Sequence, residues 1–566
     1  MRGVWERMDT EARALWACLV GAAVAAACLS AGARLHSTVS GQCVPVHPID
    51  VAVGLARGSV PGAVLWWAVG TALAAAALIT VAAVVARRAW RSRHPGARPR
   101  RRRGDEAARS GASRRDLEAL GEEAAREKAE RLRVDAGGAV GLPIGRLLRA
   151  GRPLLFSSWE DVSVMVAGPR TGKTTGWVVP RILAAPGAVV ATSNKRDIVD
   201  LTGRARAAHG PVHVFDPQGI LGDPPACWWN ILAGVTTATR AIALAEVFID
   251  TTRAPGARVD AFFDGKAKEL VAALLLAAAS GGRAITAVHT WLATPSDDEP
   301  VRLLRAAGHQ LMAQSLHGVQ ALPAQTRGGV YGGASQIMSF LLNDEAIRWV
   351  TPVKDLPQFE PERFAAGEGT LYCLSQEGRG SASPIVTALT AAVIEAALDH
   401  AKTQEGGRLA RPMLVALDEA ANVCRWRELP DLYSHFGSRG IVVDTVLQSW
   451  SQGAAVWGEA GMNKLWSAAN VRAYAGGVSE DRFLQMLSHL IGTRWIDQTT
   501  SSTGRSGPST SVALRSQQRP IATVADLQSM PAGRAWVLSS GAPAAYVATV
   551  PYWEAEEDRT HDRRRA

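Results

Sequence analysis

The chain has 566 residues, a length that predicts two or three domains. Its hydrophobic content of 47% is too low for a transporter with many membrane helices, but it suits a soluble body with a few of them. The net charge is +10, but nine arginines lie between Arg87 and Arg103 with no acid among them, so the remainder is nearly neutral and the charge alone is no argument for nucleic-acid binding. The six cysteines include no C-x-x-C pair, which argues against a disulfide framework and a zinc site and favours a reducing compartment.

The N-terminal region contains two apolar segments, Ala14–Ala33 and Pro61–Ala86, each long enough to cross a bilayer. A cleaved signal peptide is the alternative for the first, although the run is long for one and a second span follows. The loop Arg34–Val60 holds two arginines, whereas the segment after the second span is rich in them, so the positive-inside rule places both termini in the cytoplasm. We therefore expect residues 1–86 to form a two-helix membrane anchor, followed by a basic and charged linker at 87–150.

A nucleotide site is predicted in the segment Val162–Pro180, VSVMVAGPRTGKTTGWVVP, which reads as a buried strand, a Gly/Pro-rich turn and a helix. The turn fits the phosphate-binding loop with alanine in place of its first glycine; an ordinary strand-to-helix turn is the alternative. Backbone N–H groups of such a loop wrap a phosphate, Lys173 would reach the β- and γ-phosphates, and Thr174 would ligate Mg²⁺. The predicted nucleotide-binding residues are Ala167, Gly168, Pro169, Arg170, Thr171, Gly172, Lys173, Thr174 and Thr175.

Two further strands carry polar residues at their ends. Met413–Leu417 ends in Asp418 and Glu419, where a Mg²⁺-coordinating aspartate and a water-activating glutamate of an ATPase would lie. Ile441–Leu447 ends at Gln448, which could sense the γ-phosphate or simply cap a loop. Arg439 precedes that strand and is either an arginine finger for a neighbouring subunit or a surface arginine before a glycine turn.

The predicted fold class is α/β: a RecA-like P-loop NTPase with a mainly parallel, doubly wound sheet. Its two parts are expected at 151–235 and 351–556, on either side of an all-α inserted domain at 236–350, with a charged tail at 557–566. The Ser/Thr/Gly-rich segment Thr499–Ser511 is predicted to be a mobile loop. Additional strands are expected at Ala188–Thr192, Val212–Phe215, Thr370–Leu374, Val471–Tyr474 and Ala535–Leu538.

Several segments, in this order along the chain, resemble the type IV secretion coupling proteins of bacterial conjugation, the TraG/TraD kind within the FtsK/HerA-like superfamily. The resemblance extends over about Phe156–Trp553 and rests on the combination of segments. These are AGPRTGKTTGWVVPRIL, ATSNKRDIVDLT, FDPQG, WWN, LVALDEAANV, SRGIVVDTVLQSWSQ and RPIATVADLQSMPAGRAWVL.

The resemblance implies a homohexameric ring with a membrane stem and a cytoplasmic all-α domain, which recruits single-stranded DNA with its attached relaxase and moves DNA or protein towards a type IV secretion channel. It also implies that Lys173 and Thr174 bind MgATP, Asp418 binds Mg²⁺, Glu419 activates the attacking water and Gln448 contacts the γ-phosphate. Arg439 would be the finger in trans, although its spacing from the acidic pair varies in the family. The chain departs from the family in the bulky residues 169–171 and in its short loop between the spans, which puts the contact with the channel in doubt.

Other functions fit the sequence less well. An FtsK-like translocase of double-stranded DNA usually has a winged helix after the motor, and only about two dozen residues follow the strand at 535–538. A transporter ATPase of the ABC kind would need an LSGGQ-like signature before the Asp-Glu strand. A membrane scaffold that docks secretion substrates without catalysis would have no need of all four of Lys173, Thr174, Asp418 and Glu419.

Overall fold

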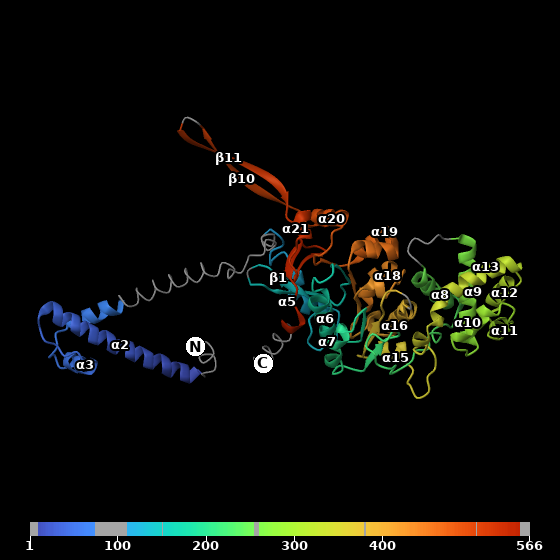
Figure 1. Ribbon diagram of the computed structural model, residues 1–566, viewed down its shortest axis with the longest axis horizontal. Helices are drawn as coiled ribbons and strands as arrows, with labels where there is room; N and C mark the ends of the chain where they lie inside the picture. Colours follow the sequence, from blue (N-terminus) through green and yellow to red (C-terminus); the bar gives the residue numbers. More distant parts are fainter. Residues whose placement is uncertain are drawn as a thin grey trace. The chain divides into compact units, whose positions relative to one another are not determined.

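The computed structural model describes residues 10–73, 110–149, 151–253, 260–378, 381–504 and 507–554, of which 10–22 and 496–516 are described by their backbone alone. The chain forms two compact units, residues 1–101 and 102–566. Figure 1 shows the elements of both.

The N-terminal unit contains α2 (Thr10–Ser40), α3 (Pro48–Ala56) and a helix at Ala63–Leu73. α2 includes the first predicted membrane span, whereas residues 74–86 of the second lie outside the described residues. A side chain at Gly32 of α2 would collide with the backbone of Ala68, so α2 and the helix at Ala63–Leu73 pack closely. Within the described part of the chain, one helix, Ser383–Thr403, is long and apolar enough to cross a membrane, and it is mostly buried in the core of the larger unit. The two-helix anchor therefore stays a prediction.

The larger unit is built on an eleven-stranded mixed sheet in the order β2-β1-β13-β12-β9-β3-β8-β7-β4-β6-β5. The strands from β9 to β5 are parallel, and β12, β13, β1 and β2 extend the sheet in antiparallel fashion. This mostly parallel sheet confirms the predicted α/β class. It also includes β1, which lies within the segment 87–150 that was predicted to be a linker. The strand bounds are β1 Leu142–Leu147, β2 Leu154–Ser157, β3 Ser163–Val166, β4 Val189–Ser193, β5 Val212–Phe215, β6 Thr370–Leu374, β7 Met413–Leu417, β8 Ile441–Leu447, β9 Val471–Tyr474, β12 Arg534–Ser539 and β13 Ala545–Ala548.

Both faces of the sheet are covered by helices, as the continuous apolar runs of its strands require. In β7, for example, Met413, Val415 and Leu417 belong to one core cluster while Leu414 and Ala416 belong to the cluster on the opposite face. The second face carries α6 (Val179–Ala184) and α7 (Asp197–Arg206). The first face carries α16 (Ser383–Thr403), α18 (Leu429–Phe436) and α19 (Trp450–Ala468), and the remaining helices around the sheet are η2 (Glu118–Leu120), α5 (Glu122–Arg131), α15 (Pro361–Ala365), η5 (Glu405–Gly407), α20 (Asp481–Ile491) and α21 (Val524–Gln528).

Between β5 and β6 the chain forms a helical bundle (Figure 1). The described residues of 236–350 include no strand, as expected for an all-α insertion. α9 is its central helix: it packs against α8 and α10–α13, and its residues from Leu270 to Ala278 are all buried. The bounds are α8 Ala238–Thr252, α9 Ala261–Ser280, α10 Thr286–Ala293, α11 Glu299–Ala306, α12 Gln310–Gln320, α13 Ala324–Ile337, η4 Ser339–Leu342 and α14 Asp344–Ile347.

The prediction of a mobile loop at Thr499–Ser511 is wrong. The region forms a long antiparallel hairpin of β10 (Thr493–Gly504) and β11 (Gly507–Pro520), which projects from the body near α20 and α21 (Figure 1). The Ser/Thr/Gly-rich composition predicts a loop, but the threonines in it have a high strand propensity. The pairing between the two strands also satisfies the hydrogen-bonding groups of the backbone.

Candidate nucleotide-binding site

The site lies at the carboxyl edge of three neighbouring strands, β3, β8 and β7. Because parallel strands end at the same edge, the loop after β3, Gln448 after β8 and the acidic pair after β7 come together. The sequence placed each of these groups at a strand end, and the sheet order now shows that the three ends are adjacent.

The phosphate-binding loop is held by backbone hydrogen bonds to the strands on either side of β3. The Ala167 N–H donates to the carbonyl of Leu447 at 2.9 Å, and the Gly168 N–H donates to the carbonyl of Gly476 at 2.9 Å. A side chain at Gly168 would overlap the backbone of Gly477, so glycine is required there for the close approach. Gly172 has φ +87°, which also favours glycine.

The remaining loop residues are placed by short-range contacts. The Thr171 hydroxyl donates to the Gly168 carbonyl at 2.9 Å, and the Thr175 hydroxyl donates to the Gly172 carbonyl at 3.4 Å. Pro169 and Arg170 are exposed at the tip, and Arg170 adopts a left-handed φ of +60°. The bulky tip of the loop therefore points to solvent and leaves the phosphate-binding backbone intact.

The helix after the loop begins with a π-helical turn, η3 (Thr174–Val178), before α6. Such turns are frequent at functional sites. Gly176 lies against the Thr549 side chain, whose Oγ1 would be 2.8 Å from an added Cβ. Because η3 begins at Thr174, directly after Lys173, the positive dipole end of the helix lies at the loop.

The acidic pair after β7 is connected to the loop by direct bonds. The Thr174 hydroxyl donates to Asp418 Oδ2 at 2.9 Å, and Lys173 Nζ lies 2.7 Å from Glu419 Oε1. Gln448 Nε2 donates to the other oxygen, Oε2, of Glu419 at 2.7 Å. The structure thus brings together five of the predicted site residues in one network.

Electrostatics at this edge depend on the burial of Asp418. Only 2% of the residue is exposed. Burial raises the pKa of Asp418 to about 7, with a further rise from Glu419, while Lys173 and the Thr174 hydroxyl oppose the shift. A bound divalent cation would favour the ionised form, so the Asp418 carboxyl group would ionise more readily with the cation bound than without it.

Two residues of this network were missed by the sequence analysis. Asn422 donates its side-chain N–H to Glu419 Oε2 at 3.3 Å, and the Thr192 hydroxyl donates to the backbone carbonyl of Asp418 at 2.9 Å. Glu419 itself has a left-handed φ of +55°, a strained conformation for glutamate that these contacts help to maintain. The position of Asn422, one turn after the acidic pair, is the sequence signal that could have identified it.

A buried ion pair beneath the loop was missed as well. Arg181 of α6 lies 3.0 Å from Asp444 of β8, and both side chains are 0% exposed. The Trp177 indole N–H donates to the same carboxylate at 2.9 Å, and the Ser163 hydroxyl donates to it at 2.6 Å. An aspartate within the apolar strand IVVDTVL was the available signal. This network fixes the helix that begins at the loop to the two central strands.

Arg439 lies apart from the other predicted site residues. It is at the start of β8, whereas Gln448 follows the end of the strand, and its guanidinium donates to the Gly407 carbonyl at 3.0 Å. A seven-residue strand spans about 23 Å, so Arg439 cannot reach the site of its own chain. Its role as a finger in trans stays a prediction.

Comparison with known proteins agrees with this site. Residues 412–532, which include the acidic pair and Gln448, match the family model described as the TraM recognition site of TraD and TraG. The chain is 29% identical to the protein VirD4 of Rhizobium radiobacter over 157 residues, 26% of this chain and 22% of that protein. It is 30% identical to VirD4 of Agrobacterium fabrum over 149 residues, 25% of this chain and 22% of that protein. The matches thus span about a fifth of these relatives.

Solved structures show the same fold. The bacterial conjugative coupling protein TrwBΔN70 in its unbound form aligns with a TM-score of 0.52 at 16% identity, over 72% of this chain and 88% of that one. TrwB in complex with ADP and Mg²⁺ aligns with a TM-score of 0.50 at 15% identity, over 72% of this chain and 89% of that one. The fold is therefore RecA-like, and the resemblance predicted from the sequence is confirmed: this chain is similar to type IV coupling proteins of the TraG/TraD type.

Proposed function

We propose that this protein is a membrane-anchored, ATP-dependent DNA-translocating coupling protein, which links a relaxase–DNA substrate to a type IV secretion channel during conjugative transfer. The observation that carries the proposal is the convergence of Lys173, Thr174, Asp418, Glu419 and Gln448 at one sheet edge. The similarity to VirD4 and TrwB supplies the conjugative context, and TrwB has been solved with ADP and Mg²⁺.

The donor set fits ATP with Mg²⁺. The Thr174 hydroxyl and the Asp418 carboxylate lie 2.9 Å apart, and hard oxygen ligands of this kind are those that Mg²⁺ prefers. Bound Mg²⁺ would neutralise charge that develops on the phosphates during transfer. The loop N–H groups and Lys173 would hold the phosphates, and Thr174 and Asp418 would hold the metal.

Glu419 is suited to orient and activate water because its two carboxylate oxygens are already held. Lys173 binds one oxygen, and Gln448 and Asn422 bind the other. When Lys173 turns to a phosphate, Glu419 loses its cation but keeps the two amide donors. The carboxylate then stays in place as a base while its first oxygen becomes free for water.

The ring is part of the same proposal. Arg439 is too far from the site of its own chain to act there, so a role in hydrolysis requires the site of a neighbouring subunit. In a homohexamer, a guanidinium supplied in trans would stabilise the charge of the transition state and make hydrolysis depend on assembly.

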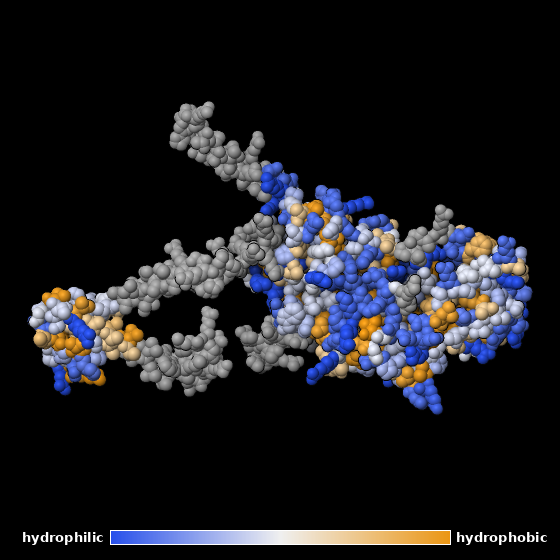
Figure 2. All heavy atoms as spheres, in the orientation of Figure 1, coloured by the Kyte–Doolittle hydropathy of each residue, from blue (hydrophilic) through white to orange (hydrophobic). Residues whose placement is uncertain are grey.

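The N-terminal unit supplies the proposed membrane anchor. Its helices expose large apolar side chains, among them Trp66 at 79% and Leu73 at 67%, and Figure 2 shows apolar residues on the visible surface of this unit. Such exposure is unfavourable in water and suits a lipid environment. With both termini in the cytoplasm, the NTPase would act at the inner face of the cell membrane.

The test is ATP hydrolysis by the full-length protein in detergent or nanodiscs, with and without single-stranded DNA, compared with Lys173→Ala and Glu419→Gln. DNA-stimulated hydrolysis that is lost in both variants supports the proposal. Nucleotide binding without hydrolysis in the unmodified protein favours a docking scaffold instead. Hydrolysis that is stimulated equally by double-stranded DNA favours an FtsK-like translocase.

A further inference from the structure

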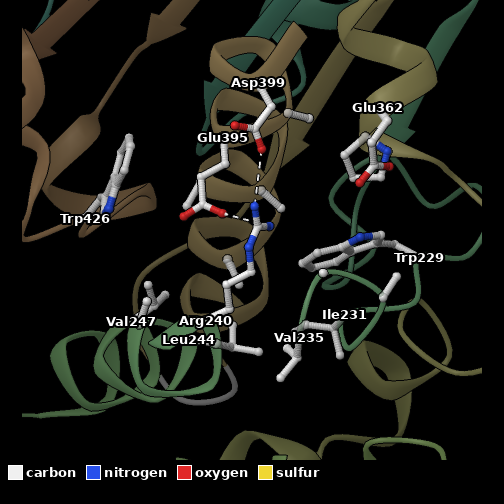
Figure 3. Close-up of a pocket in the computed structure, with 18 of the residues that line it drawn as sticks. Trp229, Ile231, Val235, Arg240, Leu244, Val247, Glu362, Glu395, Asp399 and Trp426 are labelled. Carbon is white, nitrogen blue, oxygen red and sulfur yellow. Dashed lines mark hydrogen bonds and ion pairs between the residues drawn. The ribbon is translucent and has the colours of Figure 1, made fainter. Parts of the chain in front are cut away.

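The first helix of the all-α insertion, α8, packs against α16 of the NTPase body and has two hollows beside it. Figure 3 shows the first, a pocket of about 120 Å³, with Leu244 and Val247 of α8 below and the α16 residues Glu395 and Asp399 above. A second hollow of about 430 Å³ continues along the same helix. Trp426 lines both. Both hollows are open to solvent, so side chains of α8 do not fill the space on these two sides of the helix.

The direct polar contacts across this junction are weak. Arg240 of α8 lies 3.2 Å from Asp399 (Figure 3), and both side chains are about half exposed. Arg427 lies 3.2 Å from Asp250 at the other end of α8, and its side chain is 64% exposed. Exposed ion pairs typically stabilise a structure by about 0–1 kcal/mol each. These ion pairs therefore contribute little to the position of α8, and the buried Trp426 lines both hollows beside it.

Trp426 is connected to Glu419 by a short stretch of hydrogen-bonded chain. α17 (Ala420–Val423) begins directly after Glu419, and its residue Asn422 binds the Glu419 carboxylate. The Cys424 N–H donates to Ala420 at 3.0 Å, and the Trp426 N–H donates to Cys424 at 2.9 Å. A change in the position of the Glu419 side chain is thus passed to Trp426 within two turns.

A second connection reaches Trp426 from Gln448. α19 begins at Trp450, two residues after Gln448, and one of its residues, Trp457, donates its indole N–H to the Trp426 carbonyl at 2.8 Å. The two side chains that hold each other at the nucleotide site, Glu419 and Gln448, therefore lead by separate routes to the same residue.

We propose that residues 424–428 form a joint that couples the nucleotide site to the all-α insertion, with Trp426 as its pivot and Trp457 as the residue that positions it. The inference rests on the proposed ATP binding and adds to it the route by which the insertion responds. When Lys173 leaves Glu419 for a phosphate, α17 and α19 shift together, Trp426 moves between the two hollows, and α8 follows into the free space.

Hydrogen exchange of the full-length protein, with and without Mg²⁺ and a non-hydrolysable ATP analogue, tests the joint. Peptides from 167–178 report on nucleotide binding, and peptides from 238–252 report on α8. Trp457→Phe removes the indole donor but keeps an aromatic ring. Trp291→Phe is the matched control, because Trp291 is also buried and donates its indole N–H, at 3.1 Å to Glu299, away from the joint.

We expect the analogue to protect 167–178 in all three proteins and to change exchange in α8 at least about fivefold in the unmodified protein and in Trp291→Phe. In Trp457→Phe the α8 response should fall to about a third or less, with analogue affinity within about twofold of the unmodified value. An α8 response that is absent in the unmodified protein, or equal in Trp457→Phe, overturns the joint. Loss of protection at 167–178 in the unmodified protein instead overturns the ATP binding on which the joint depends.

Discussion

The nucleotide site and the α8 junction are built in opposite ways. At the carboxyl edge of β3, β8 and β7, charged groups are buried and paired, as in Lys173 with Glu419 and Arg181 with Asp444. At the junction, Arg240 and Asp399 are both about half exposed, an exposed Arg427 pairs with the mostly buried Asp250, and two hollows lie beside α8. A buried charge without its partner is costly, so the paired groups restrict the geometry of the first region, whereas the second can change at little cost.

The comparison suggests that the two regions have different roles. Chemistry requires fixed geometry within a fraction of an ångström, which the paired edge supplies. Movement of a domain requires an interface with more than one acceptable packing, which the junction supplies. The predictions below test either how rigid the nucleotide site is or how easily the α8 junction changes its packing.

The largest effect is expected from Glu419→Gln. Removal of a general base typically lowers kcat about 10²- to 10⁴-fold, and glutamine keeps hydrogen bonds to Gln448 and Asn422 possible. Because Lys173 loses its anionic partner, nucleotide binding should become tighter. Steady-state hydrolysis and nucleotide titration of the same preparation measure both. Unchanged kcat would mean that Glu419 is not the base.

The next effect concerns the support beneath the loop. Asp444→Asn should reduce the free energy of unfolding by about 3–5 kcal/mol, because the fully buried Arg181 would lose its counter-charge. Denaturant unfolding of the larger unit measures the change. Asp200→Asn is the control: Asp200 and its partner Arg196 are both exposed, so a much smaller loss is expected. Equal losses in the two variants would show that the buried pair does not hold the edge together.

Much of the site was predictable because it follows from strand ends. β5, β6, β7, β8 and β9 have the predicted bounds, since apolar runs of buried parallel strands are a strong local signal. The order of the strands, and hence the adjacency of Thr174, Asp418 and Gln448, depends on contacts between distant segments that no local pattern specifies. The antiparallel strands β1, β2 and β13 were missed: β1 is interrupted by proline, glycine and arginine, and β2 and β13 have only 4 residues each.

The partners inside the core were the other failure. Asp444 and Arg181 lie 263 residues apart in the sequence, and each reads by itself as a polar interruption of an apolar segment. The pockets beside α8 could not be predicted either, because a void depends on how two surfaces fit and not on the composition of either. Local sequence patterns thus predict the strand ends that carry the site better than they predict contacts between distant segments.

A smaller effect is expected from Asp418→Asn in the absence of Mg²⁺. Burial raises the pKa of Asp418 from 3.8 to about 7, so the fold favours the protonated carboxyl group, and stability is lost as pH rises from 3.8 through 7 and the buried group ionises. Asparagine has no charge to desolvate. The variant should therefore be more stable than the unmodified protein at pH 8, by about 1–3 kcal/mol, and nearly equal to it at pH 4. Thermal unfolding across this range measures the difference, and a variant that is less stable at pH 8 would contradict the raised pKa.

The smallest effect on stability is expected at the junction, from Arg427→Gln. Burial raises the pKa of Asp250 and Arg427 lowers it, so loss of the arginine raises it further. The variant should lose up to about 1 kcal/mol at pH 7.5, and the loss should shrink as pH falls and Asp250 becomes protonated in the folded state. Arg302→Gln removes an exposed pair with Asp298 away from the junction and is the control for the loss of an arginine from such a pair. A loss of several kcal/mol at Arg427 would make the junction as rigid as the nucleotide edge, and α8 could then not follow the motor.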